Sequence, residues 1–283
     1  MTTPEHSIDP LLPAQMAEAC ERAGVRKAGM DTPSTLVLSF LAGAFIALGA
    51  AFFTIVVSGS ELGYGPTRLL GGVAFSLGLV LVIIGGAELF TGNALIVMAW
   101  ANRKVSTARL LRNWGLVFVG NFAGATSTAL LVFLSGQWRF GGGAVGETAL
   151  RIGRDKTDHT FVEAVALGIL CNVLVTLAVW LTFSARSNID KVVAIVFPIS
   201  AFVAAGFEHS IANMYFLPLA LLVKTDDSFV ASTGLTGDGG LDGLTWTGFL
   251  VDNLLPVTIG NIIGGALMVA GVYWFVYLRP KAA

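Results

Sequence analysis

The chain has 283 residues, of which 55% are hydrophobic and 12% are charged, and its formal net charge is −1 at pH 7. A soluble domain carries about 25% charged residues, so this composition, with a mean hydropathy of +0.77, indicates an integral membrane protein. Neither the net charge nor any basic run indicates nucleic-acid binding. Two cysteines and three scattered histidines favour neither a disulfide framework nor a metal site, and no cofactor is expected.

The first 30 residues are partly polar and acidic, which is not the pattern of a signal peptide. Within them, apolar residues recur at helical spacing over 11–25, and Gly24 suits a helix end. We therefore expect residues 1–30 to form a cytoplasmic segment with an amphipathic surface helix. The helix either binds a partner or caps the bundle without one.

Long apolar runs predict the membrane spans, because a helix needs about 20 apolar residues to cross a bilayer. Four runs are continuous, at residues 34–58, 108–135, 161–184 and 245–278. Two more are interrupted: one starts at Leu69 and resumes after E-L-F-T-G-N, and the other covers 192–223 with polar residues from Glu208 to Asn213. We predict an all-α transmembrane domain over 31–278 with six membrane segments, the second and fifth broken, and a cytoplasmic tail at 279–283.

Lysine and arginine predict the orientation, since they gather on the cytoplasmic side of membrane proteins. With six spans, both termini share one side. Six of the 17 Lys and Arg residues fall on the opposite side, and the other eleven share the side of the termini. Both termini are therefore predicted to be cytoplasmic, and the loop 224–243, rich in Gly, Asp, Ser and Thr, is expected to be an external connector.

Two short motifs recur and indicate an internal repeat. Residues 86–93 and 206–213 both read G-x-E-x-x-x-x-N, and residues 120–124 and 260–264 both read G-N-x-x-G. The motifs occur in the same order, so we predict two copies of one unit, about 31–136 and 160–278. Each copy has three spans, and the copies must therefore insert with opposite orientations. Inverted repeats of this kind place the substrate site where broken helices meet.

Broken backbone at membrane depth is tolerated only inside protein or beside a wet cavity. Half-helices that start there, after Asn93 and after His209, would point positive dipole ends inward and attract anions. His209 is expected to act in transport, because histidine changes charge near neutral pH. Thr91, in the first break, can both donate and accept hydrogen bonds, although an ordinary loop threonine is the alternative.

Other polar residues at the breaks favour a structural role. Glu88 and Glu208, with Asn93 and Asn213, are expected to hold the breaks together, either by accepting free backbone N–H groups or by neutralising a cation. Asn121 is expected to form a hydrogen bond across helices. The apolar residues near the breaks are pore-lining candidates, but their periodicity equally allows the bilayer or the core: Phe75, Leu79, Leu89, Phe90, Val175 and Phe202.

Four motifs resemble the formate/nitrite transporter family, and the resemblance extends over essentially the whole chain. They are E-L-F-T-G-N at 88–93, L-G-I-L-C-N-V-L-V at 167–175, G-F-E-H-S-I-A-N-M at 206–214 and D-N-L-L-P-V-T-I-G-N-I-I-G-G at 252–265. The last of these favours the formate channel branch. The resemblance implies an aquaporin-like fold with helices 2 and 5 interrupted, one pore per protomer, and a homopentamer in the bacterial inner membrane.

The same resemblance implies roles for individual residues. Thr91 would face His209 across the pore, and Lys156 would draw anions toward it. Polar residues near the pore would be Asn172 and Asn261. The outer constriction would be Phe75 and Phe202, and the inner one Leu79, Leu89, Phe90 and Val175. A cytoplasmic formate-producing enzyme is implied as a partner of the N-terminal helix.

A bare anion between apolar rings would be costly to desolvate. We therefore expect His209, with Thr91, to supply a proton so that formate or a similar small anion crosses as the neutral acid. Ionic conduction past a charged imidazolium is the alternative. Nitrite, hydrosulfide and, less favoured, a neutral solute remain alternative substrates. An intramembrane enzyme is not expected, because neither H-E-x-x-H nor G-x-S-x-G occurs.

Overall fold

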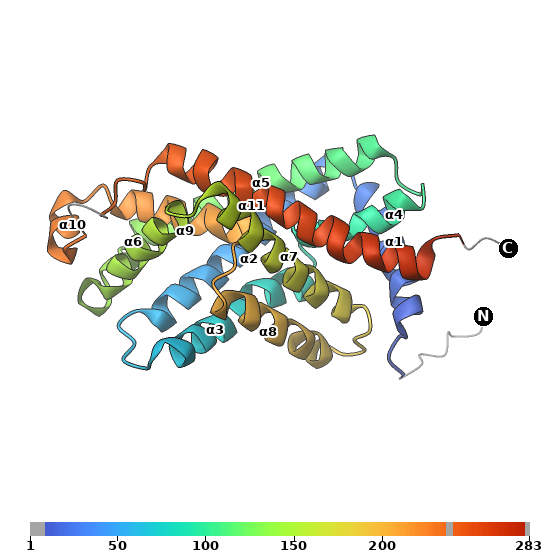
Figure 1. Ribbon diagram of the computed structural model, residues 1–283, viewed down its shortest axis with the longest axis horizontal. Coiled ribbons are helices and arrows are strands. Elements are labelled where there is room, and N and C mark those ends of the chain that lie inside the picture. Colours follow the sequence, from blue (N-terminus) through green and yellow to red (C-terminus); the bar gives the residue numbers. More distant parts are fainter. Residues whose placement is uncertain (1–8, 236–239, 281–283) are drawn as a thin grey trace.

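The computed structural model describes residues 9–235 and 240–280, and all regular structure within these ranges is helical (Figure 1). The first part contains α1 (Pro13–Ala28), α2 (Thr32–Val57), α3 (Tyr64–Gly85), the 3₁₀ helix η1 (Gly92–Ile96), α4 (Val97–Ala101) and α5 (Thr107–Leu134). Two 3₁₀ turns, η2 (Gln137–Arg139) and η3 (Gly141–Gly143), then lead to α6 (Ala144–Thr157), α7 (Phe161–Thr182), α8 (Asn188–Ala204), α9 (Ser210–Val223) and α10 (Asp227–Thr233). The last helix is made of η4 (Gly248–Leu254), α11 (Leu255–Ile262), η5 (Ile263–Gly271) and η6 (Trp274–Leu278), and its η segments are π-helical.

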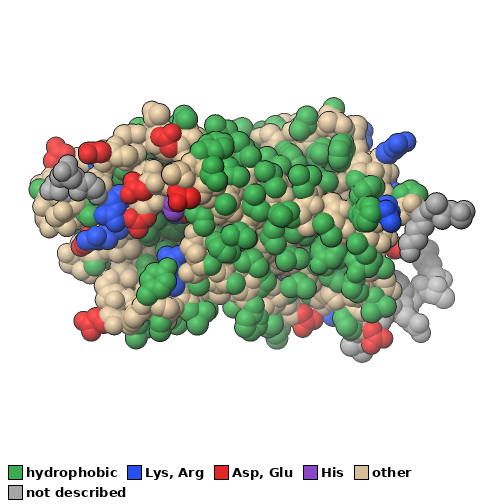
Figure 2. Space-filling model, viewed as in Figure 1, with side chains coloured by type: hydrophobic (Ala, Val, Ile, Leu, Met, Phe, Trp, Pro, Cys, Tyr) green, Lys and Arg blue, Asp and Glu red, His purple; other side chains and the backbone are tan. Residues whose placement is uncertain are grey.

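Five of these helices are long and apolar enough to cross a membrane: α2, α3, α5, α7 and the helix at 248–278. Four of them match the continuous apolar runs to within a few residues, and α3 begins at Tyr64, before the expected start at Leu69. Figure 2 shows hydrophobic side chains over the middle of the molecule and charged ones toward the two ends of its long axis. The prediction of an all-helical, multi-pass membrane protein is confirmed.

Two apolar helices stop short, and each is followed by irregular backbone and a shorter helix. Gly86 after α3 and Gly206 after α8 have φ values of 79° and 76°, the left-handed conformation in which glycine commonly ends a helix. The short helix η1 then begins at Gly92, slightly before the expected start after Asn93. The other short helix, α9, begins at Ser210 with His209 as its N-cap.

Glycines allow the helices around these interruptions to pack closely. A Cβ at Gly124 of α5 would overlap the carbonyl oxygen of Phe40 in α2, and a Cβ at Gly264 of η5 would overlap that of Ile169 in α7. The two G-N-x-x-G motifs therefore lie at corresponding helix contacts, α5 with α2 and the last helix with α7. Such contacts between small residues are a common way to hold membrane helices together.

Two expectations, one about the N-terminal helix and one about the loop 224–243, are corrected. Helix α1 continues through Gly24 to Ala28, because Gly24 is needed inside the helix: a Cβ there would meet Ile96 and Ala99 at 3.3 Å. The loop 224–243 is more than a connector, since it contains α10, which is capped by Asp226; its residues 236–239 lie outside the described ranges. The helix α1 and the end of the last helix lie together, at the end opposite α6 and α10 (Figure 1).

Candidate functional site

The two interruptions meet at a buried contact between Thr91 and His209. Thr91 Oγ1 lies 2.9 Å from His209 Nε2, and the two residues are 0% and 2% exposed. His209 Nδ1 accepts the backbone N–H of Ala212 at 3.1 Å. Because Nδ1 accepts, the neutral ring carries its proton on Nε2 and donates it to Thr91 Oγ1. The Thr91 hydroxyl proton is then left to donate to another acceptor.

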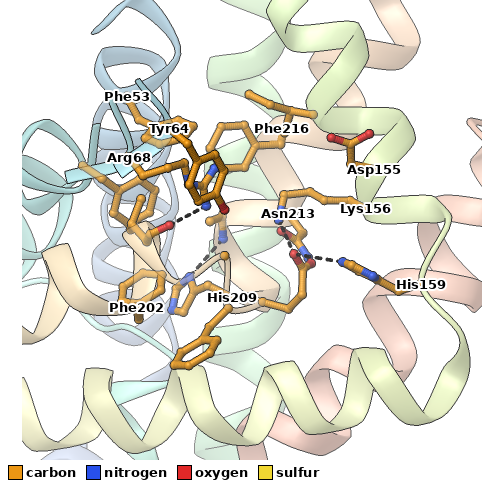
Figure 3. Close-up of a pocket in the computed structure, with 17 residues that line it drawn as sticks. Phe53, Tyr64, Arg68, Asp155, Lys156, His159, Phe202, His209, Asn213 and Phe216 are labelled. Atoms are coloured by element: carbon orange, nitrogen blue, oxygen red, sulfur yellow. Dashed lines mark hydrogen bonds and ion pairs between the residues drawn. The ribbon is translucent and has the colours of Figure 1, made fainter. Parts of the chain in front are cut away.

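A cavity of about 330 Å³ opens beside His209 (Figure 3). We call it the Lys156 vestibule, and its charged or titratable lining consists of Tyr64, Arg68, Asp155, Lys156, His159, Glu208 and His209. Phe75 and Phe202 also line it and meet edge to face, with ring centroids 5.6 Å apart. The Phe202 ring lies 5.9 Å from the imidazole of His209, so the predicted aromatic pair stands next to the histidine.

A second cavity, of about 480 Å³, is lined by a different set of residues that does not include His209. We call it the Lys27 vestibule; its charged lining consists of Arg26, Lys27, Glu88 and Lys191. Leu79, Leu89 and Gly92 also line it, so its wall includes close sequence neighbours of Thr91. All four predicted inner-constriction residues belong to the buried core, and Phe90 and Val175 do not line this cavity, so the inner constriction stays a prediction. Phe90 packs edge-on against Trp114 and Phe118.

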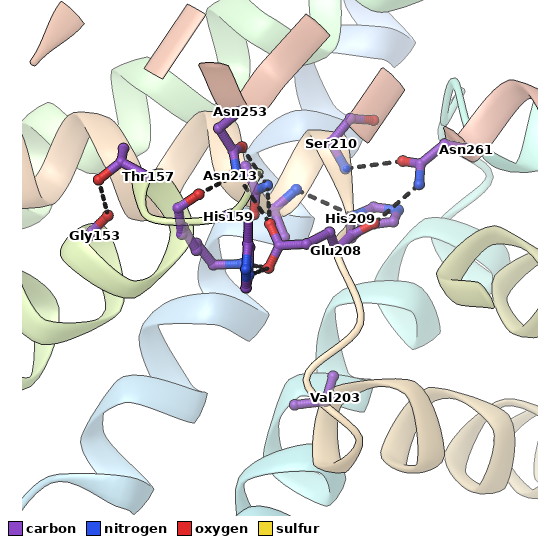
Figure 4. A network of polar contacts seen from close by, with 12 residues as sticks. Gly153, Thr157, His159, Val203, Glu208, His209, Ser210, Asn213, Asn253 and Asn261 are labelled. Carbon is purple, nitrogen blue, oxygen red and sulfur yellow. Dashed lines mark hydrogen bonds and ion pairs between the residues drawn. The ribbon is translucent and has the colours of Figure 1, made fainter. Parts of the chain in front are cut away.

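A carboxylate network supports the second interruption (Figure 4). Glu208 is 2% exposed, and its Oε1 accepts from Lys156 Nζ at 2.7 Å. Its Oε2 accepts from Asn213 Nδ2 at 2.7 Å and from Asn253 Nδ2 at 3.2 Å. Asn253 also donates to the Lys156 carbonyl at 2.8 Å, so this network ties the end of α6 to the start of α9. A buried charge requires such pairing, because leaving it unpaired is costly.

The first interruption has a matching network. Glu88 accepts from Lys27 Nζ at 2.6 Å and from Asn93 Nδ2 at 2.8 Å. Asn93 also donates to Asn113 Oδ1 at 3.0 Å, and Asn113 donates to the Lys27 carbonyl at 3.2 Å. Each glutamate therefore pairs with a lysine and an asparagine.

At each interruption, one asparagine on a neighbouring helix bonds both a backbone carbonyl and a backbone N–H. Asn261 donates to the carbonyls of Glu208 and Gly168 at 2.9 and 2.8 Å. Its Oδ1 accepts the N–H of Ser210 at 2.9 Å. Buried backbone groups need such partners because no water replaces them there.

Asn121 repeats this arrangement at the first interruption. It donates to the carbonyls of Glu88 and Ser39 at 2.9 and 2.7 Å, and it accepts the N–H of Phe90 at 2.9 Å. Asn172 joins the two halves, because it donates to the Asn261 carbonyl at 2.6 Å and to the Thr91 carbonyl at 3.4 Å.

Three residues of these networks were not singled out by the sequence: Lys27, Asn113 and Asn253. Asn113 and Asn253 each precede the asparagine of a G-N-x-x-G motif by eight residues, a signal that was present in the sequence. Lys27 is harder to find, because it precedes its glutamate by 61 residues whereas Lys156 precedes its own by 52. Because the chain between lysine and glutamate differs in length in the two networks, the correspondence of Lys27 to Lys156 is hidden in the sequence.

A helical bundle with a buried Thr–His contact between two charged vestibules is the architecture of a membrane channel or transporter. The formate/nitrite transporter family model matches residues 14–275, so the chain belongs to the formate/nitrite transporter family. The resemblance stated from the motifs is thereby confirmed.

Similar proteins have been characterised or solved. The formate channel FocA of Escherichia coli (strain K12) is 43% identical over 280 residues, which cover 98% of each chain. The formate channel FocA of Haemophilus influenzae is 37% identical over 266 residues, 93% of each chain. A solved pentameric formate channel with formate bound is 44% identical, with a TM-score of 0.81 over 88% of this chain and 98% of that one. A solved FNT family ion channel is 27% identical, with a TM-score of 0.77 over 93% and 98%.

Proposed function

We propose that the protein is a pH-dependent formate channel of the bacterial inner membrane, a homopentamer with one pore in each protomer. The observation that carries this proposal is the Thr91–His209 contact, since His209 lines one vestibule with cationic side chains and Gly92, the neighbour of Thr91, lines the other. The names of similar proteins, formate channels and one of them pentameric, support the substrate and the assembly. A formate-producing enzyme at the N-terminal helix stays a prediction.

The proposed architecture is an aquaporin-like bundle of six crossings. Helix α3 with η1 and α4, and α8 with α9, would each form one interrupted crossing. The matching networks around Glu88 and Glu208 support two inverted repeats. Because Lys27 of α1 corresponds to Lys156 of α6 in these networks, we propose that α1 and α6 open the two repeats, at 13–134 and 144–278. These limits are wider than those the motifs alone suggest.

The proposed mechanism moves formate and a proton together. Cationic side chains concentrate the anion in a vestibule, where the Thr91 hydroxyl donates to a carboxylate oxygen. Protonation of His209 at Nδ1 requires release of the Ala212 N–H, so the resting ring is neutral. Water supplies a proton to the ring when formate arrives, and a proton then passes through the Thr91 hydroxyl to formate. Formic acid crosses the apolar constriction and loses its proton to water on the far side.

Formate uptake into proteoliposomes that contain the His209→Asn variant tests this mechanism. Asparagine can still cap α9, but it does not ionise. We expect formate uptake to lose its dependence on pH, or to fall by roughly 10²-fold, as when a positioned acid–base group is removed. Unchanged pH-dependent uptake would show that His209 is not the proton donor.

The preferred anion is tested in proteoliposomes with the wild-type protein, where nitrite and hydrosulfide compete with formate for uptake. Uptake of nitrite or hydrosulfide without uptake of formate would contradict the formate proposal.

A further inference from the structure

The two vestibules are built from corresponding residues, and one pair differs in its capacity to ionise. Lys27 and Lys156 lie 129 positions apart and occupy the same place in the two networks. The same shift of 129 relates Met30, which lines the Lys27 vestibule, to His159, which lines the Lys156 vestibule. The Lys156 vestibule therefore has the titratable ring of His159 at the position where the Lys27 vestibule has the thioether of Met30.

The fixed charges of the two mouths also differ. The described lining of the Lys27 vestibule has three cations, Arg26, Lys27 and Lys191, and the single carboxylate Glu88. The lining of the Lys156 vestibule has two cations, Arg68 and Lys156, and two carboxylates, Asp155 and Glu208. The charged lining of the Lys27 vestibule therefore has a net positive charge that does not depend on a histidine. The lining of the Lys156 vestibule is formally neutral unless one of its histidines becomes charged.

His159 is placed to change that balance (Figure 3). Its Nε2 lies 3.9 Å from Glu208 Oε1, the same oxygen that accepts from Lys156 Nζ at 2.7 Å. A separation of 3.9 Å is too long for a hydrogen bond, so the neutral ring leaves the Lys156–Glu208 pair undisturbed. The His159 side chain is 29% exposed and can take a proton directly from water in the vestibule, whereas His209 is buried.

Other ionisable groups line the Lys156 vestibule with His159 or lie next to it in the chain. Those on the surrounding elements are Asp155 and Lys156 of α6, Asp158 before α7, Glu163 of α7, Tyr64 and Arg68 of α3, and Glu208 and His209 before α9. Because the groups share one cavity, its field acts on any anion that enters.

We propose that His159 is a positioning residue that switches the Lys156 mouth from neutral to cationic as the pH on that face falls. The charged imidazolium competes with Lys156 for Glu208 Oε1, which releases the ammonium group to attract the entering anion. The Lys27 mouth, with Met30 at the corresponding position, collects anions at every pH. Entry from the Lys156 face thus gains a pH dependence that entry from the other face lacks. This inference rests on the proposed formate channel function.

The test is formate entry measured from each face separately, in intact cells and in inside-out vesicles of a host without its own formate transport. The pH on the entry face is varied from about 5 to 8, the range in which histidine ionises. Wild type is compared with His159→Met, which copies the Lys27 mouth and stays neutral, and with His159→Arg, which stays charged. Asp155→Asn adds net positive charge without altering the histidine. At each pH, the entry rate of wild type is divided by that of His159→Met. Both rates are measured at the same bulk formic acid concentration, so its effect cancels in the ratio.

We expect the wild-type to His159→Met ratio to rise by about fivefold from the alkaline to the acid limit on one face only, within the range known for electrostatic steering. His159→Arg should keep entry high throughout, and Asp155→Asn should raise entry at the alkaline limit. A ratio that is constant with pH, or His159→Arg behaving like His159→Met, would overturn the inference. If wild type itself carries no formate, the proposed function fails instead, so the two failures are distinguishable.

Discussion

At the scale of single residues, the most demanding task in this fold is to satisfy the buried backbone where α3 and α8 end and the shorter helices η1 and α9 follow. One asparagine does so at each interruption, Asn121 at the first and Asn261 at the second, with three backbone partners each. A side-chain amide suits this task because it combines donors and an acceptor in one rigid group. A place for Asn261 near the pore stays a prediction, and these bonds show its structural role at the second interruption.

Replacing Asn121 with leucine should strongly destabilise the protein. The change leaves the buried Glu88 carbonyl and Phe90 N–H without their side-chain partner, and each such group costs about 1–3 kcal/mol. We expect a loss of roughly 3 kcal/mol or more in the free energy of unfolding, read as a lower thermal midpoint in detergent. Asn188→Leu, on the exposed start of α8, is the control and should change stability by less than about 0.5 kcal/mol. Equal midpoints for the two variants would refute this role.

At the scale of helices, close packing at glycines determines how the interrupted helices are held. Helix α5 approaches α2 so closely at Gly124 that no side chain fits between them. Farther along the same helix, Gly115 has no neighbour within 4 Å of where a Cβ would lie. The two glycines therefore look alike in sequence and differ entirely in their surroundings.

Alanine substitutions at these two glycines should have opposite effects. Gly124→Ala forces α5 away from α2, and overpacking of this kind typically costs about 1–3 kcal/mol. Gly115→Ala meets nothing and should stabilise the helix by up to about 1 kcal/mol, because glycine is a poor helix former. Thermal midpoints of the two variants in detergent provide the comparison. A destabilised Gly115→Ala and an unaffected Gly124→Ala would contradict the observed helix contact.

At the scale of the whole molecule, the two ends differ in charge and in the helices they carry. The end with α1 holds the permanently cationic Lys27 vestibule, and the opposite end holds α6, α10 and the Lys156 vestibule. The distribution of Lys and Arg predicts that the α1 end faces the cytoplasm. The proposed direction of the His159 switch depends on this orientation, since it would place His159 outside the cell.

Cysteine labelling can test this orientation with little background. Cys20 and Cys171 are both buried, and burial raises the pKa of the Cys20 thiol to about 12, so it is almost entirely in the unreactive protonated form. We expect a membrane-impermeant maleimide to label Ser232→Cys of α10 in intact cells. It should label Asn188→Cys of α8 only after the membrane is permeabilised. The reverse pattern would place the termini outside.

The sequence by itself determined that this is a helical membrane protein, where most of its apolar helices lie, and where Thr91 and His209 occur. These features could be predicted because the bilayer requires long apolar runs, and any polar group within such a run stands out against them. The recurring motifs also marked the asparagines that support the interruptions. The sequence was misleading at Gly24, because helical spacing cannot tell a glycine that ends a helix from one that allows another helix to approach.

Only the tertiary structure decided which charges meet. Lys27 and Glu88 are 61 residues apart, and nothing local in the sequence links them until α1 docks against η1 and α4. The structure also showed that Leu79 and Leu89 line a cavity, although they belong to the same buried core as Phe90 and Val175, which do not line it. Apolar residues satisfy both environments equally well, so their sequence pattern carries no information about which one they occupy. Packing between distant helices determines it.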